Sequence, residues 1–109
     1  MTAAAAADGA ISPTFAHHHH QLSQYLVGAD ALLRHVVEVG WPAAVDRAVR
    51  AQWAAIHRLA ITEADLLSAL ARTEVELTFV RGFAERREEL VVAYEAHCWA
   101  LDFSRRSEQ

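Results

Sequence analysis

Apolar residues return along this chain in alternating steps of four and three positions, which is the spacing of one face of an α-helix. The longest series runs from residue 66 to residue 101, and only Thr73 and Arg87 interrupt it. Its members are Leu66, Leu70, Thr73, Leu77, Val80, Ala84, Arg87, Val91, Tyr94, Cys98 and Leu101. A stripe that keeps its register for about five heptads predicts a long helix that packs against a partner along its whole length.

A first helix is predicted over about 13–39. Ser12 can cap it, and Pro13 suits its first position because the N–H that proline lacks would have no helical partner there. Its own apolar series consists of Phe15, Leu22, Leu26, Ala29, Leu33 and Val36. Gly40 ends this helix and Pro42 begins the next one, so the turn between them is short.

The second and third helices are predicted over about 42–60 and 63–103. Thr62 and Asp65 resemble a capping box with Asp in place of Glu, and a capping box marks the start of a helix. The third helix would then contain roughly 41 residues and measure on the order of 60 Å.

Gly82 is the one candidate for a bend or break in the third helix, because glycine within a helix costs about 1 kcal/mol relative to alanine. The heptad series crosses Gly82 without a skip, which favours a continuous or slightly bent helix. Phe79 and Phe83 flank the glycine on one helix face, so it could instead let another backbone come close.

The fold class that follows is all-α, an antiparallel bundle of three helices, because short turns join successive helices in opposite directions. A chain of 109 residues has the size of about one domain. We assign residues 13–109 to a single helical domain. Residues 1–12 are rich in alanine, and we expect them to form a disordered tail.

The composition narrows the choice of compartment and partner. A formal net charge of -4 with scattered acidic residues leaves no basic patch for phosphates, which disfavours a nucleic acid partner. No apolar run approaches the roughly 20 residues of a membrane span, so no membrane is expected as a partner. The single cysteine, Cys98, favours a reducing compartment, and we expect the cytoplasm. All 10 basic residues are arginine, which is typical of a GC-rich bacterial genome.

The leading function that the sequence predicts is protein–protein interaction through the long C-terminal helix. Two shorter neighbours would cover only part of that helix, and the remaining apolar surface predicts another protein or a second copy in a homodimer. The residues expected to make this contact are Leu77, Val80, Ala84, Arg87, Val91, Tyr94, Cys98 and Leu101. A regulatory or accessory subunit, an inhibitor or an immunity-type protein would act in this way.

A row of charged residues borders this apolar seam. Glu74, Arg81, Glu88 and Glu95 recur every seven residues. In coiled coils such flanking positions select the partner and its orientation. The predominantly negative row argues against a close parallel pairing of two copies, and it favours an antiparallel pair or a different partner.

A metal-binding bundle is the first alternative function. His17 and His20 lie three residues apart in the predicted first helix, so they share a helix face as two imidazole ligands of a transition metal would. His57 or His97 could supply a further ligand. No other cofactor is expected.

A small ligand-binding protein or enzyme is the second alternative, with an apolar pocket lined by Trp41, Trp53 and Trp99. No catalytic residue is assigned. Cys98 lies on the apolar seam, where a thiol most simply acts as a small apolar side chain.

Overall fold

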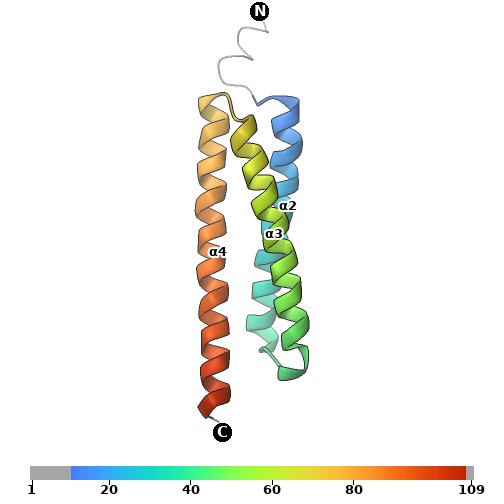
Figure 1. Ribbon diagram of the computed structural model, residues 1–109, viewed down its shortest axis with the longest axis vertical. Coiled ribbons are helices and arrows are strands. Elements are labelled where there is room, and N and C mark those ends of the chain that lie inside the picture. The colour runs from blue at the N-terminus through green and yellow to red at the C-terminus, as the bar shows by residue number, and fades with distance from the viewer. Residues whose placement is uncertain (1–10, 108–109) are drawn as a thin grey trace, which may run out of the picture.

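The structure, a computed structural model, describes residues 11–107, which form three long helices and one short 3-10 segment (Figure 1). In chain order the elements are α2 (Pro13–Val39), η1 (Ala43–Val45), α3 (Asp46–Leu70) and α4 (Glu74–Ser107). Helices α2 and α4 run in the same direction, and α3 packs against both and runs antiparallel to them. The predicted all-α bundle of three antiparallel helices is confirmed.

Both ends of α2 lie where the sequence predicts them. The Ser12 side chain accepts a hydrogen bond from the Phe15 N–H at 3.1 Å, and Pro13 occupies the first turn. Gly40 adopts φ 80°, a left-handed conformation that glycine tolerates without strain, and the helix ends there. Ile11, assigned by the sequence to the tail, packs against the core. Ser12, also assigned to the tail, caps α2, and residues 1–10 of the predicted disordered tail lie outside the described residues.

The predicted boundary between the second and third helices is wrong. Helix α3 continues through Thr62 to Leu70, and the Thr62 hydroxyl donates to the Arg58 carbonyl at 3.1 Å, a bond typical of a helix interior. The capping box lies eleven positions later along the chain, at Thr73 and Glu76. There the Glu76 N–H donates to Thr73 Oγ1 at 3.1 Å, and the Glu76 carboxylate accepts from the Thr73 N–H at 3.3 Å.

Glu76 also joins the start of α4 to the start of α2. Its carboxylate accepts hydrogen bonds from the Ser12 N–H at 2.9 Å and from the Arg72 N–H at 2.8 Å. The side chain is only 1% exposed. Hydrogen bonds from Ser12 and then Arg72 hold the pKa of Glu76 below its ordinary value, because they favour the ionised form. One buried carboxylate therefore links two helix ends.

The core lies mainly between α2 and α3. All six residues of the predicted apolar series of the first helix are buried, which confirms that series. The other buried apolar residues are Val49, Trp53, Ala60 and Leu67 of α3 and Leu90 of α4. Helix α4 therefore closes the bundle with fewer fully buried side chains than either of its neighbours.

Helix α4 is continuous through Gly82, so neither a break nor a loop occurs there. Its 34 residues correspond to about 51 Å, less than predicted because the segment before Ala71 belongs to α3. The longer α3 covers part of α4 that the sequence analysis left without cover, and Val91 and Tyr94 pack against the core. Among residues 11–107, no helix has the length and apolar character needed to cross a bilayer.

Candidate functional site

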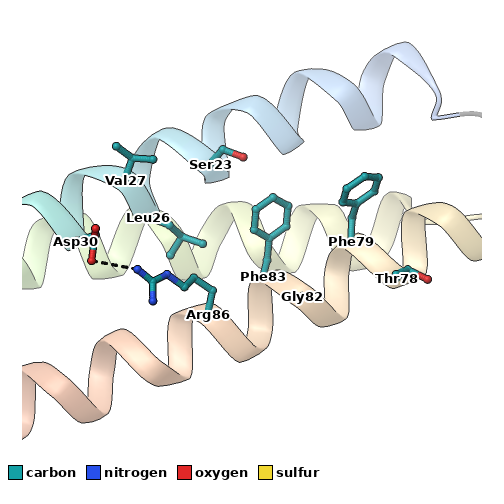
Figure 2. Close-up of a pocket in the computed structure, with 9 residues that line it drawn as sticks. All are labelled: Ser23, Leu26, Val27, Asp30, Thr78, Phe79, Gly82, Phe83 and Arg86. Atoms are coloured by element: carbon teal, nitrogen blue, oxygen red, sulfur yellow. Dashed lines mark hydrogen bonds and ion pairs between the residues drawn. The ribbon is translucent and has the colours of Figure 1, made fainter.

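An open groove lies between α2 and α4 and is lined only by residues of these two helices (Figure 2). The lining residues are Ser23, Leu26, Val27 and Asp30 of α2 and Thr78, Phe79, Gly82, Phe83 and Arg86 of α4. Its volume of about 400 Å³ falls within the size range of ligand sites, and most of its wall is apolar. We refer to this feature as the α2–α4 groove.

Aromatic side chains form one end of the α2–α4 groove. Phe79 and Phe83 lie one turn apart on α4, and Figure 2 shows both rings rising from α4 toward α2. The His19 ring of α2 meets both edge to face, with centroids 4.8 Å from Phe79 and 4.9 Å from Phe83. Such contacts contribute about 0.5–1.5 kcal/mol beyond area burial, so His19 helps to fix the spacing of the two helices.

Gly82 forms part of the groove floor. A Cβ atom added to Gly82 would meet no other atom within 4 Å, so the backbone of α4 is open to approach at this point. Glycine within a helix costs about 1 kcal/mol of stability relative to alanine. Packing inside the bundle does not explain why a glycine stands here, because a larger residue would also fit. The space above Gly82 is therefore available to an incoming chain.

A second hollow of about 280 Å³ continues along the same two helices. Its apolar wall comes from Leu33, Val37, Leu90 and Ala93. Asp30 and Arg86 line both hollows, which makes the two hollows parts of one groove.

Ion pairs cross and border this groove. Asp30 accepts a hydrogen bond from Arg86 at 3.0 Å and pairs with Arg34 at 3.0 Å, and Arg86 also contacts Glu89 at 3.1 Å. Solvent-accessible pairs of this kind contribute about 0–1 kcal/mol. Arg86 can therefore exchange its partners at little cost to the stability of the bundle.

An aromatic cluster joins α3 to α4 farther along the bundle. The Trp53 and Tyr94 rings stack with centroids 4.2 Å apart and planes 5° from parallel, and His57 stacks on the Trp53 ring. Trp41 contacts Tyr94 at 5.8 Å, and the Arg50 guanidinium lies 5.8 Å from the Trp41 ring centre. Burial raises the pKa of the Tyr94 hydroxyl, which stays protonated.

A chain of ion pairs lies beside this cluster. Asp46, in the first turn of α3, accepts from Arg50 at 2.8 Å and from Arg105 of α4 at 3.0 Å. Arg50 also donates to Asp102 at 2.8 Å. The hydrogen bond from Arg50 lowers the pKa of Asp46, and the bond to Asp46 raises that of Arg50. These contacts hold the last turns of α4 against the start of α3.

The contact residues predicted from the sequence divide between two environments. Leu77 and Ala84 are exposed, whereas the other six are half-buried. The half-buried residues are Val80, Arg87, Val91, Tyr94, Cys98 and Leu101. Val80, Val91 and Tyr94 pack against the core of their own chain, so much of the predicted contact seam is occupied within the bundle.

The histidines do not come together as the metal-binding alternative requires. His17 and His20 are exposed on α2, whereas His57 stacks on Trp53 and His97 is half-buried on α4. Within the described part of the chain, no three His, Cys, Asp or Glu side chains form a group that could hold a metal ion.

The three tryptophans do not line a common pocket in the described structure. Trp41 and Trp53 both contact Tyr94, but Trp99 is exposed and stacks on Phe103. The small hollow beside Trp53, of about 10 Å³, has no room for a ligand.

The α2–α4 groove was not among the sites predicted from the sequence. Gly82 between Phe79 and Phe83 was the available signal, and a close approach of another backbone at this point was one interpretation of it. The contribution of Leu26, Val27 and Asp30 could not be inferred, because it depends on how α2 and α4 lie relative to each other.

The chain matches no protein-family model, no curated protein and no solved structure in the three comparisons. Its function must therefore be inferred from its own structure.

Proposed function

We propose that this protein is a protein–protein interaction module that binds an amphipathic helix of a partner protein in the α2–α4 groove. The observation that carries the proposal is an apolar groove with an open glycine in its floor. The groove uses α4, the long C-terminal helix that the sequence analysis expected to make contacts, but on a different face from the predicted seam.

The directions of the helices favour a helical ligand. Because α2 and α4 run the same way, a fourth helix between them can run antiparallel to both, as neighbours do in a four-helix bundle. Helices pack with their axes about 8–10 Å apart, and a position without a side chain permits the short end of this range. Gly82 supplies such a position, and the single methyl group of an alanine there would still leave room for a helix within this range.

The groove also defines the chemistry of the partner helix. Apolar side chains at positions i, i+3 or i+4, and i+7 would fill the hollow beside Phe79 and Phe83, and further ones would reach the hollow beside Val37 and Ala93. A polar group is required between them, where the Asp30–Arg86 pair crosses the groove. The span from Phe79 to Ala93 corresponds to about 21 Å, or roughly four helical turns.

The composition also bears on the compartment and on the class of partner. A single cysteine favours a reducing compartment such as the cytoplasm, and the net charge of -4 disfavours nucleic acid. The arginine-only basic set favours a bacterial source. Because much of the predicted contact seam packs against the core of its own chain, the predicted homodimer would have to use another face of α4.

Peptide binding to groove variants tests the proposed function. The probe is a synthetic amphipathic peptide of about 18 residues, with Leu at core positions and Glu and Arg elsewhere, which spans about 27 Å as a helix. We expect micromolar binding to the wild type. Gly82→Trp should weaken binding at least about tenfold, a change of about 1.4 kcal/mol, because the indole fills the groove.

Gly82→Ala is the matched control. Its added methyl group meets no atom of the bundle and is too small to fill the hollow, so the peptide should bind about as it binds the wild type. Circular dichroism should show that both variants keep the helical content of the wild type. Equal binding by Gly82→Trp and the wild type, or no wild-type binding at millimolar peptide, contradicts the proposal.

A further inference from the structure

The outer face of α4 carries an apolar stripe that its own bundle does not cover. Val92 is 57% exposed, Trp99 70% and Phe103 57%, and Ala96 lies exposed between them. Their steps of four, three and four residues place them on one face of the helix. We refer to these four residues as the outer stripe.

The outer stripe is separate from the inward face of α4. Tyr94 points into the bundle and stacks on Trp53, whereas Trp99 and Phe103 stack on each other outside it, with centroids 5.5 Å apart and planes 10° from parallel. Two adjoining exposed aromatic rings form a rigid apolar surface, which is typical of a binding surface. Neither ring lines the α2–α4 groove.

We propose that the outer stripe binds a second copy of this chain, with the two α4 helices antiparallel about a two-fold axis between His97 and Cys98. In this register, residue n of one copy lies opposite residue 195 − n of the second copy. Val92 then faces Phe103 of the second copy, and Ala96 faces Trp99. Each layer joins a smaller side chain to an aromatic one, as interdigitating packing requires. This inference goes beyond the proposed function and does not depend on the groove.

Charge complementarity selects this orientation. In the antiparallel register, Glu89 lies opposite Arg106 of the second copy, and two-fold symmetry repeats the pair at the other end of the stripe. A parallel pair would instead place Glu89 against Glu89 and Arg106 against Arg106, and like charges in contact disfavour that arrangement.

Two acidic residues beside the stripe, Glu95 and Asp102, cause little repulsion in the antiparallel pair. Glu95 and Asp102 of opposite copies lie on the same flank, but Asp102 already accepts a hydrogen bond from Arg50 at 2.8 Å, which offsets its charge. The contact spans about 17 residues, or about 26 Å of helix. A surface of this length lies near the lower size limit of specific interfaces, so we expect a dissociation constant in the micromolar range.

Sedimentation equilibrium of the full chain measures this association. The wild type should be largely dimeric at about 100 µM, and Trp99→Glu should raise the dissociation constant at least about thirtyfold, because it puts two charges into the central layers. Leu59→Glu is the matched control, since Leu59 is 48% exposed on α3 and lies outside the stripe. A monomeric wild type, or equal weakening by both variants, overturns the proposal.

Disulfide trapping tests the orientation. Val92→Cys and Phe103→Cys are each made in a Cys98→Ala background and are oxidised separately and as a mixture. The antiparallel register predicts crosslinked dimers mainly in the mixture, joining residue 92 of one copy to residue 103 of the other. Efficient crosslinking of Val92→Cys to itself indicates a parallel pair and overturns the register. Gly82→Trp should leave the dimer unchanged, which separates this inference from peptide binding in the groove.

Discussion

The two ends of the bundle are held together by different interactions. At the end where α2 and α4 begin, the buried Glu76 carboxylate accepts backbone N–H groups from Ser12, Arg72 and Thr73. Toward the other end, the Trp53–Tyr94 stack and the ion pairs of Asp46 join α3 to α4.

The two ends also differ in whether their buried hydrogen-bond donors have partners. Within residues 11–107, the buried donor atoms Trp41 Nε1 and Arg105 Nη2 have no hydrogen-bond partner, and both lie toward the end with the aromatic cluster. The end held by Glu76 depends on one ionised group in a fixed network, whereas the other depends on ring packing and accessible charges. Acid should weaken both ends, because the pKa values of Glu76 and Asp46 are both lowered in the folded protein. Loss of ring area and added salt should weaken mainly the end with the aromatic cluster.

Of the substitutions considered at the two ends, removal of the Trp53 ring should lower the free energy of unfolding the most. Trp53 is buried and stacks on both Tyr94 and His57. Trp53→Ala should lower the free energy of unfolding by about 3–5 kcal/mol through lost burial and the cavity left behind. Urea denaturation followed by circular dichroism measures the change. A loss below about 1 kcal/mol would show that the aromatic cluster does not hold α4 in place.

Neutralising the buried carboxylate should have the next largest effect. Glu76→Gln keeps the shape of the side chain but sets an NH₂ group against backbone donors, so about 2–3 kcal/mol should be lost at pH 7. The matched control is Glu74→Gln in the same first turn, where the side chain is exposed. It should change stability by less than about 0.5 kcal/mol.

The pH dependence gives this substitution a second signature. The pKa of Glu76 is lowered in the folded protein from its ordinary value of 4.5, so its contribution is present above that value and is lost as pH falls through the folded pKa. As pH falls below about 4.5, the stability of the wild type should drop more steeply than that of Glu76→Gln. Parallel pH profiles would contradict the role assigned to this carboxylate.

The Asp46 ion pairs should give the smallest effect. Asp46→Asn removes a charge that pairs with Arg50 and Arg105 and lies at the N-terminus of α3, and about 1 kcal/mol should be lost. Because salt screens accessible charges, the difference from the wild type should shrink between about 0.05 and 1 M NaCl. A salt-independent difference would show that the side chain acts through something other than its charge.

Local signals of the sequence predicted α2 well. Ser12, Pro13 and Gly40 are strong start and stop residues, and a six-member apolar series left one choice of buried face. The boundary between α3 and α4 was harder, because two Thr-x-x-acid patterns compete, at Thr62 and Thr73. The apolar phase also continues across the loop, so periodicity alone could not reveal where the chain turns.

One inward-facing row of α4 lies one position away from the predicted seam, whereas Val80, Val91 and Tyr94 of that seam do pack inward. Glu76, Phe83 and Leu90 repeat every seven residues and face inward, while the neighbouring Leu77 and Ala84 are exposed. This row begins with Glu76, and a charged residue does not suggest a buried position. Its burial is favourable only because three backbone N–H groups donate to its carboxylate. The α2–α4 groove could not be predicted from local patterns, because it depends on the spacing of two helices that are far apart in sequence.

Peptide titration of the isotope-labelled protein, followed by NMR, can locate the residues at which a partner helix binds and so examines the α2–α4 groove directly. If the peptide lies in the groove, the amide shift changes should cluster around Val27, Asp30, Gly82, Phe83 and Arg86. Changes concentrated instead on the outer stripe around Trp99, or spread evenly over the three helices, would contradict binding in the groove.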